Sequence, residues 1–190
     1  MSAKETLEET YQKYVSWMKI YESAKERTQR DKNFAPKVIP PGKSKKTPYE
    51  HQIIADYFDQ LYTEITELYI LNIITTFERM VFNKIDNAYG VIKDIVTVEY
   101  NKRYSKKDKP APLYHSAVSF IKVKEDIHNL SGARKVLEKQ ITEELSEDLK
   151  EIIEYRNWLS HGKRRNVGEA SILTIEQIKE ILMKIIDEIE

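Results

Sequence analysis

The chain has 190 residues, with 31 Lys and Arg against 31 Asp and Glu, 41% hydrophobic residues and no Cys. This length suits one domain spanning 1–190, and the balanced charge argues against bulk electrostatic binding to duplex nucleic acid or anionic membranes. The lack of Cys excludes disulfides, zinc ribbons and thiol nucleophiles. Because there is neither a signal region nor a run of about 18 apolar residues, we expect a cytoplasmic protein without a membrane span.

The first quarter of the chain predicts a helix followed by a loop. Ser2 and Glu5 have the spacing of a capping box, which favours a helix over about 3–31. The loop that follows, up to residue 47, is rich in Lys and Pro. Its lysines are either ordinary solvated charge or a basic rim that faces RNA. We expect the segment 1–47 to form an extension of the core domain.

The middle of the chain predicts several helices. All six prolines lie in two short windows, and the long proline-free stretches between and after them favour helix. A helical pattern over about 48–88 forms either one helix or two. Gly90 interrupts the apolar period, so we expect a separate helix over about 91–104 and a further one over 113–129.

The last third of the chain predicts two more helical segments. One covers about 133–161 and is either continuous or broken near Thr142. The other covers 174–190 and begins at a capping box formed by Thr174 and Gln177. Strand signals are scarce. We therefore predict an all-α fold, an up-and-down bundle of four to five core helices with an additional N-terminal helix.

Two charged residues lie on apolar stripes of these predicted helices. Arg156 occupies a place where the 3- and 4-residue spacing calls for a core residue, and Glu78 does the same on an earlier helix. The apolar members of the two stripes are Leu145, Leu149, Ile152 and Leu159, and Leu71, Ile74, Val81 and Ile85. Because an unpaired guanidinium is costly to bury, Arg156 needs a partner acid or a functional role. One interpretation is an ion pair with Glu78 that sets the register of the bundle, and the other is a functional site.

A histidine follows Arg156 at the end of the same predicted helix. His161 directly precedes Gly162, and a Gly is common just beyond a helix C-terminus. His161 lies five positions after Arg156, roughly 140° around the helix and about one and a half turns along it, so both side chains can serve one cavity. Asn157 lies four residues before His161, close enough for its amide to hold the imidazole in one tautomer.

The segment Glu154–Gly162, with the sequence Glu-Tyr-Arg-Asn-Trp-Leu-Ser-His-Gly, resembles the Arg-x-x-x-x-His motif of the HEPN superfamily. That family favours a polar residue directly after the Arg, as Asn157 is here, and often has an upstream Phe-Glu pair, which Phe77 and Glu78 resemble. The resemblance implies a helical bundle that dimerises so that two motifs face one cleft and form a composite active site. It also implies a metal-independent endoribonuclease of a toxin–antitoxin, abortive-infection or related defence system. RNA would be the substrate, and an antitoxin or other regulatory protein a further partner.

The same residues suit RNA cleavage on chemical grounds. RNA carries its own nucleophile, the 2′-OH, so cleavage needs proton transfer and charge stabilisation but no metal ion or other cofactor. His161 would act as general acid or base, and Arg156 would hold the scissile phosphate with its fork of donors. Asn157 would orient His161 or the phosphate, and Glu78 would orient Arg156.

Residues outside this motif add less to the prediction. Lys163, Arg164 and Arg165 follow it and either contact the RNA backbone or complement the helix C-terminus by charge. The other histidines lack metal-ligand spacing, so we expect no metal site. They are His51, His115 and His128. The sequence also lacks the glycine-rich phosphate loops and the nucleophile elbow of other hydrolases.

Two other functions fit the sequence. A catalytically inactive HEPN-like module would use the same cleft to bind RNA, a nucleotide or a protein partner. Alternatively, the bundle would scaffold or neutralise another protein through the acidic helix that carries six Asp and Glu residues from Glu143 to Glu154. If Arg156 and His161 were buried in a monomer and satisfied by Glu78 and its neighbours, the geometry for catalysis would be lost.

Overall fold

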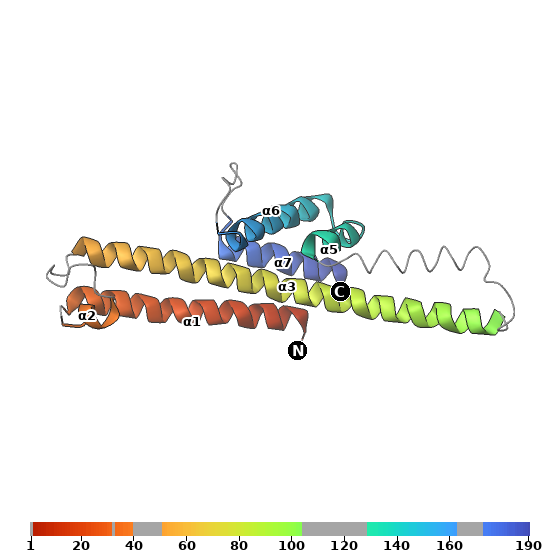
Figure 1. The fold of residues 1–190 in the computed structure, drawn as a ribbon, viewed down its shortest axis with the longest axis horizontal. Helices are drawn as coiled ribbons and strands as arrows, with labels where there is room; N and C mark the ends of the chain where they lie inside the picture. Colours follow the sequence, from red (N-terminus) through yellow and green to blue (C-terminus); the bar gives the residue numbers. More distant parts are fainter. Residues whose placement is uncertain (1, 32, 40–50, 104–128, 163–172) are drawn as a thin grey trace.

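The computed structural model describes residues 2–31, 33–39, 51–103, 129–162 and 173–190, and within these residues the protein is all-helical. The helices are α1 (Ala3–Arg30), α2 (Ala35–Val38), α3 (His51–Arg103), α5 (Leu130–Leu137), α6 (Glu143–Ser160) and α7 (Ile175–Ile189). The long helix α3 sets the long axis of the molecule. α1 runs antiparallel beside it, while α5, α6 and α7 gather against its middle (Figure 1). The predicted all-α bundle with an N-terminal helix is confirmed.

Hydroxyl side chains cap three helix starts, and two of these are the predicted capping boxes. Ser2 Oγ accepts the N–H of Glu5 at 3.1 Å, and the N–H of Ser2 donates to the Glu5 carboxylate at 2.6 Å. Thr174 and Gln177 form the same reciprocal pair at the start of α7. Thr142 caps α6 with its hydroxyl, so the break near this residue is confirmed.

Two helix boundaries differ from the sequence prediction. α3 continues through Gly90, so the expected division between helices over 48–88 and 91–104 is wrong. An isolated Gly costs about 1 kcal/mol relative to Ala in a helix interior, which is too little to end a long helix that contains no Pro. α5 begins earlier than expected because Asn129 caps it, accepting a backbone N–H of its first turn at 2.9 Å. Apart from Asn129, the predicted helix over 113–129 lies outside the described residues.

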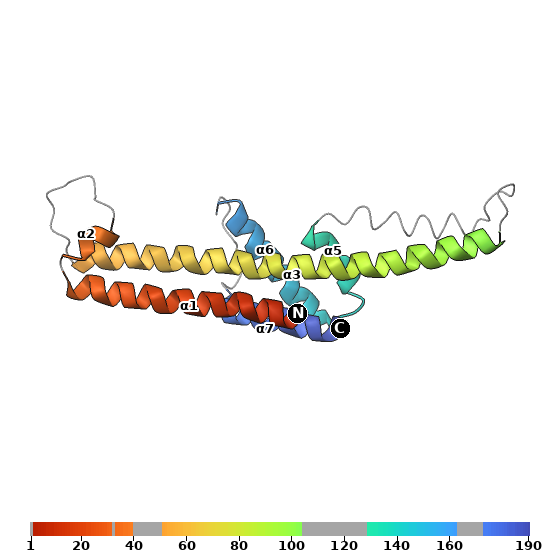
Figure 2. The ribbon, with the colours of Figure 1, turned by 90° about the horizontal axis from the view of Figure 1, so that it is seen from below.

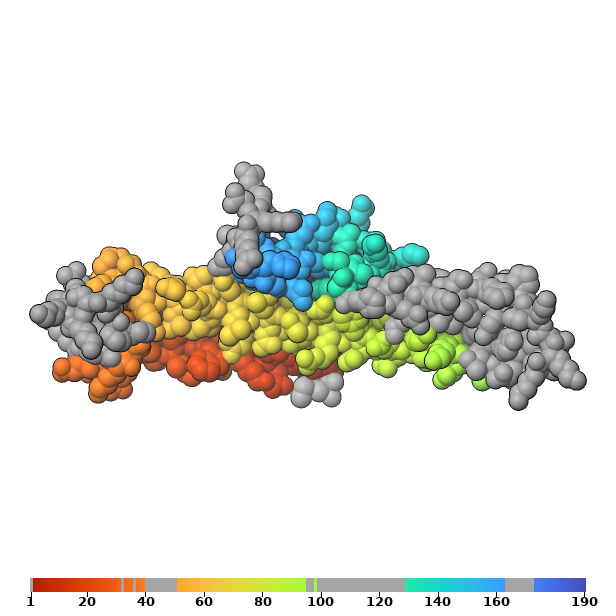
Figure 3. Space-filling model, viewed as in Figure 1, coloured from red at the N-terminus to blue at the C-terminus, as the bar shows by residue number. Residues whose placement is uncertain are grey.

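The main hydrophobic core lies where α1, α3, α5, α6 and α7 meet. Figure 2 shows α6 crossing α3, while α7 runs along α1 and α3. In the space-filling view α5 and α6 rise from the middle of an elongated molecule (Figure 3). Fully buried side chains from all five helices fill the core, among them Leu7, Phe77, Ala133, Ile152 and Leu182. The N-terminal helix thus contributes directly to the same core as α6 and α7.

A second, smaller core closes the end of the molecule at which α1 and α3 are joined. It contains Tyr21 of α1, Ile54 and Phe58 of α3, and Ala35 and Ile39 at the ends of α2. The hydroxyl of Tyr21 donates to the carbonyl of Phe58 at 3.0 Å, and the two rings pack edge to face. This end is therefore a two-helix hairpin capped by α2. None of the described helices has an apolar stretch long enough to cross a lipid bilayer.

Candidate functional site

The two charged residues predicted from the apolar stripes meet where α6 crosses α3. Arg156 Nη2 of α6 lies 3.4 Å from Glu78 Oε2 of α3, and the two side chains are 32% and 15% exposed. Both side chains approach the core from stripes whose neighbouring members, such as Ile152 and Ile74, are fully buried. The pairing expected from the sequence is present, and one third of the guanidinium side chain is left accessible to a ligand.

Glu78 has a second contact that the sequence did not predict. Its other carboxylate oxygen, Oε1, accepts the backbone N–H of Leu130 at 3.1 Å. Leu130 is the first residue of α5, so its N–H has no acceptor within its own helix. A single carboxylate therefore connects α3, α5 and α6, and it holds Arg156 while one of its oxygens is fixed by the backbone of α5.

Asn157 contacts Arg156 rather than the imidazole. Its side-chain oxygen Oδ1 accepts a hydrogen bond from Arg156 Nη1 at 3.2 Å. Its backbone carbonyl accepts the N–H of His161 at 3.0 Å. Among the described residues Asn157 thus orients the guanidinium through its side chain, and it reaches His161 only through the backbone of the helix. The expected contact between the Asn157 amide and the imidazole is not formed.

His161 is the C-cap of α6 and its side chain is exposed. The next residue, Gly162, has φ +67°, a left-handed conformation that residues with a Cβ rarely adopt. The N–H of Gly162 donates to the carbonyl of Leu159 at 3.1 Å, which closes the last turn of the helix. The imidazole is therefore presented to solvent at a well-defined helix end, about 7.5 Å along the axis from Arg156.

Aromatic residues flank the motif. Tyr155 and Trp158 stack with ring centroids 5.7 Å apart and an angle of 21° between the rings. Burial raises the pKa of the Tyr155 hydroxyl, and the negative charge of Glu67 on α3 raises it further. Tyr155 is buried in the main core and Trp158 packs against it, so the helix turn that carries Arg156 is anchored to the core.

Several residues named from the sequence fall outside the described part of the chain. They are Lys163, Arg164, Arg165, His115 and His128. The remaining histidine, His51, is exposed at the start of α3, at the opposite end of the hairpin from the motif. Among the described residues, no three His, Asp or Glu side chains are grouped closely enough to hold a metal ion.

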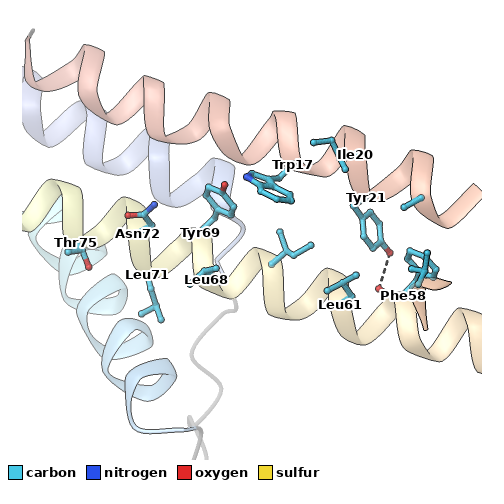
Figure 4. A pocket seen from close by; sticks show the side chains of 13 residues that line it. Trp17, Ile20, Tyr21, Phe58, Leu61, Leu68, Tyr69, Leu71, Asn72 and Thr75 are labelled. Carbon is cyan, nitrogen blue, oxygen red and sulfur yellow. Dashed lines mark hydrogen bonds between the residues drawn. The ribbon is translucent and has the colours of Figure 1, made fainter. Parts of the chain in front are cut away.

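A second feature was not found from the sequence. An apolar groove of about 850 Å³ lies between α1 and α3, beside the hairpin core (Figure 4). At one end of the groove lie Leu71 and Thr75 of α3, and Thr75 is one helical turn before Glu78. The residues that line the groove repeat at 3- and 4-residue spacing in the sequence. Buried core residues repeat at the same spacing, so the sequence does not distinguish the groove from the core.

The chain matches no protein-family model, no curated protein and no solved structure.

Proposed function

We propose that this protein is a metal-independent endoribonuclease that cleaves RNA with His161 and Arg156, acting in the cytoplasm as part of a toxin–antitoxin, abortive-infection or related defence system. The observation that carries the proposal is the way in which neighbouring side chains hold the Arg156 guanidinium. Glu78 and Asn157 fix the guanidinium from two sides while leaving part of it exposed, near an exposed histidine on the same helix end. The resemblance of the Arg-x-x-x-x-His segment to the HEPN superfamily supports the same reading.

The chemistry requires one proton acceptor, one proton donor and one fixed cation. A base removes the proton of the RNA 2′-OH, the oxygen attacks the adjacent phosphorus, and the bond from phosphorus to the 5′ oxygen breaks. The leaving 5′ oxygen takes a proton from an acid, so that the products are a 2′,3′-cyclic phosphate and a 5′-OH. Arg156 stabilises the negative charge that develops on the non-bridging oxygens. An imidazole exchanges protons near neutral pH, which suits His161 for the acid or base role.

A homodimer would supply both proton-transfer groups at one cleft. One chain has a single His161, so a second copy of the motif would allow one imidazole to act as base and the other as acid. The exposure of His161 at the end of α6 is compatible with such an arrangement. An antitoxin or other regulatory protein would act by covering this helix end.

A second candidate function is a catalytically inactive HEPN-like module that binds RNA, a nucleotide or a protein. The contacts of Glu78 favour it, because a carboxylate that ties Arg156 to the N–H of Leu130 also explains a buried arginine by structure alone. The acidic side chains on α6 favour the form of this module that binds a protein rather than RNA or a nucleotide. Among them Glu151 and Glu154, within two turns of Arg156, are exposed and would repel a phosphate backbone.

The test is cleavage of end-labelled single-stranded RNA by the purified protein in excess EDTA. We expect 2′,3′-cyclic phosphate ends from the wild type, and a loss of about 10²-fold or more in rate for His161→Ala and for Arg156→Ala. Arg156→Lys retains the charge but loses the forked donors, so it should also be slow. His51→Ala removes an exposed histidine far from the motif and should cleave like the wild type.

Circular dichroism and sedimentation must show that each variant keeps its fold and its oligomeric state. Equal cleavage by the wild type and the motif variants would point to a contaminating nuclease. If a folded dimer cleaves none of a diverse set of RNAs, the binding module becomes the better description of the protein.

A further inference from the structure

The groove between α1 and α3 has the pattern of a helix-binding seam. On α1 its lining residues Trp17, Ile20 and Ala24 are separated by three and four residues. On α3 the lining residues that repeat at four and three residues are Leu61, Ile65, Leu68, Asn72 and Thr75. A stripe with this 3.5-residue average is the seam that a helix presents to a neighbouring helix. Both helices of the hairpin therefore turn such a seam toward the same open groove (Figure 4).

The groove is open although its walls are apolar. Trp17, Ile20 and Leu68 are 53%, 58% and 64% exposed, whereas Tyr21 and Phe58 at its base are buried. Isolated exposed apolar side chains are ordinary on protein surfaces, but a contiguous apolar patch usually marks an interaction site. Among the described helices, α6 and α7 complete the packing around the middle of α3, and no corresponding helix covers the hairpin.

The dimensions suit one helix. From Phe58 to Thr75 the α3 wall is about 25 Å long at the rise of an α-helix, which corresponds to about 17 residues or five turns of a bound helix. An amphipathic helix binds such a groove through apolar residues at i, i+3 or i+4, and i+7. Its stripe would occupy the place that a third helix takes in a three-helix bundle.

The charges near the groove restrict the kind of helix. From His51 to Glu78, all charged side chains of α3 other than histidine are Asp or Glu. Two of these acids are engaged by basic groups of this chain, Asp59 by Lys25 and Glu78 by Arg156. Glu64 follows Leu61 by three residues and precedes Leu68 by four, so it lies on the groove side of α3 and is exposed.

On the α1 wall of the groove, the basic residue that lies beside the lining residues is already paired. Lys13 of α1, one turn before Trp17, is paired with Glu9 at 2.9 Å. We propose that the groove binds an amphipathic helix of another protein whose apolar stripe is flanked by Lys or Arg on the side that faces α3. A second copy of this chain fits less well, because its own α3 would bring the same acidic residues to the interface.

The proposal can be tested with two synthetic helical peptides of about 18 residues. Both have Leu at alternating 3- and 4-residue spacing, and they differ only in whether Lys or Glu flanks that stripe. Binding of each labelled peptide to the full-length protein is measured by fluorescence anisotropy at low and at physiological salt. We expect the Lys peptide to bind at least about tenfold more tightly than the Glu peptide.

Variants locate the binding site. Leu68→Ser and Ile20→Ser remove exposed apolar groups, so they should leave the fold intact and weaken the Lys peptide about tenfold or more. Glu64→Lys should weaken the Lys peptide and strengthen the Glu peptide. The matched control is Val136→Ser on α5, which removes an exposed apolar side chain outside the groove and should bind like the wild type.

Three results would contradict binding of a basic amphipathic helix in the groove. Equal affinity for the two peptides, or unchanged binding by Leu68→Ser and Ile20→Ser, would overturn the proposal. So would a wild-type dimer that Leu68→Ser converts to a monomer, because the occupant would then be a second copy. The groove variants leave Arg156 and His161 untouched, so RNA cleavage and peptide binding can fail independently.

Discussion

Two segments of α3 share apolar residues at 3- and 4-residue spacing but lie in different environments. In the segment from Ile70 to Val81, which we call the covered segment, the five core apolar side chains are at most 2% exposed, Phe77 among them. In the segment from Ile54 to Leu68, the hairpin segment, Phe58 is equally buried but Leu68 is 64% exposed. Both segments pair with α1. The difference lies in whether other helices cover the second face of α3.

This comparison separates two roles of an apolar stripe. In the covered segment the stripe stabilises the fold, because burying it removes apolar area from water at about 25 cal/mol per Å². In the hairpin segment the exposed part of the groove-facing stripe, at Leu68, contributes little to folding and remains available for binding. The acidic residues that interrupt the apolar stripes differ as well. Glu78 in the covered segment has partners from two other helices, whereas Glu64 in the hairpin segment is hydrogen-bonded to Gln60 of its own helix.

The largest expected effect contrasts an apolar truncation in each segment. Phe77→Ala leaves a cavity in the main core and should lower the free energy of unfolding by about 3–5 kcal/mol. Leu68→Ala removes a mostly exposed side chain and should change it by about 0.5 kcal/mol or less. Urea unfolding followed by circular dichroism gives both values. Similar losses for the two variants would mean that the groove is part of the folding core.

A smaller change in stability is expected from replacing Glu78, the acidic residue of the covered segment. Glu78→Ala leaves the Leu130 N–H without its acceptor and the Arg156 guanidinium without its carboxylate partner, and it should cost about 2–3 kcal/mol of unfolding free energy. Glu78→Gln retains one acceptor oxygen and should cost less. Glu64→Gln in the hairpin segment is the matched control and should be nearly neutral. If Glu78→Ala were as stable as this control, the connection of three helices by one carboxylate would be energetically unimportant.

Two glycines extend the comparison from side chains to the backbone. Gly162 ends α6 with φ +67°, so Gly162→Ala should lower the free energy of unfolding by about 1 kcal/mol. Gly90 lies inside α3, where an added Cβ meets no atom within 4 Å, so Gly90→Ala should raise it by about 0.5–1 kcal/mol. Thermal unfolding midpoints should therefore shift in opposite directions. A shift of the same sign for both variants would contradict the backbone geometry at one of them.

The smallest expected effect is the change in stability with pH that one surface ion pair contributes. A hydrogen bond from Lys179 of α7, assisted by one from Gln12, lowers the pKa of Glu8 on α1 below its ordinary value of 4.5. A carboxyl whose folded pKa is lowered stabilises the protein above about pH 4.5, and this contribution is lost as the pH falls through the folded pKa. Because the pair is partly exposed, it should be worth a few tenths of a kcal/mol.

This prediction is checked by comparing Glu8→Gln with the wild type at pH 7 and at about pH 3. The difference in unfolding midpoint should be present at pH 7 and shrink at the lower pH. Glu26→Gln is the control, because the Glu26–Arg30 pair lies within α1 and connects it to no other helix. A difference that grows on acidification would show that the Glu8 contact does not stabilise the ionised form.

Much of this structure follows from local sequence signals. The capping residues Ser2, Thr142 and Thr174 place three helix starts, because a hydroxyl at an N-cap satisfies donors that have no partner within the helix. The meeting of Arg156 with Glu78 was also predictable, since a charged residue on an apolar stripe needs a partner of opposite charge.

Other features depend on long-range packing and could not be predicted from local patterns. The continuity of α3 through Gly90 reflects the cooperative stability of a 53-residue helix, which outweighs the weak local preference of one glycine. The hydrogen bond from Leu130 to Glu78 joins residues 52 positions apart and exists only because α5 packs on α3. Whether Asn157 would orient Arg156 or His161 depended on side-chain conformations that spacing alone leaves open.

By itself, the sequence determined that the chain is all-helical, where several helices begin, and that Arg156 and Glu78 belong to one site. These properties depend on hydrogen bonds between residues close in sequence and on the periodic spacing of apolar residues, both of which can be recognised within a few helical turns. The tertiary structure alone decided which apolar stripes are covered. Trp17, Ile20 and Leu68 carry the same spacing as core residues, and they are exposed because, among the described helices, none covers the groove between α1 and α3.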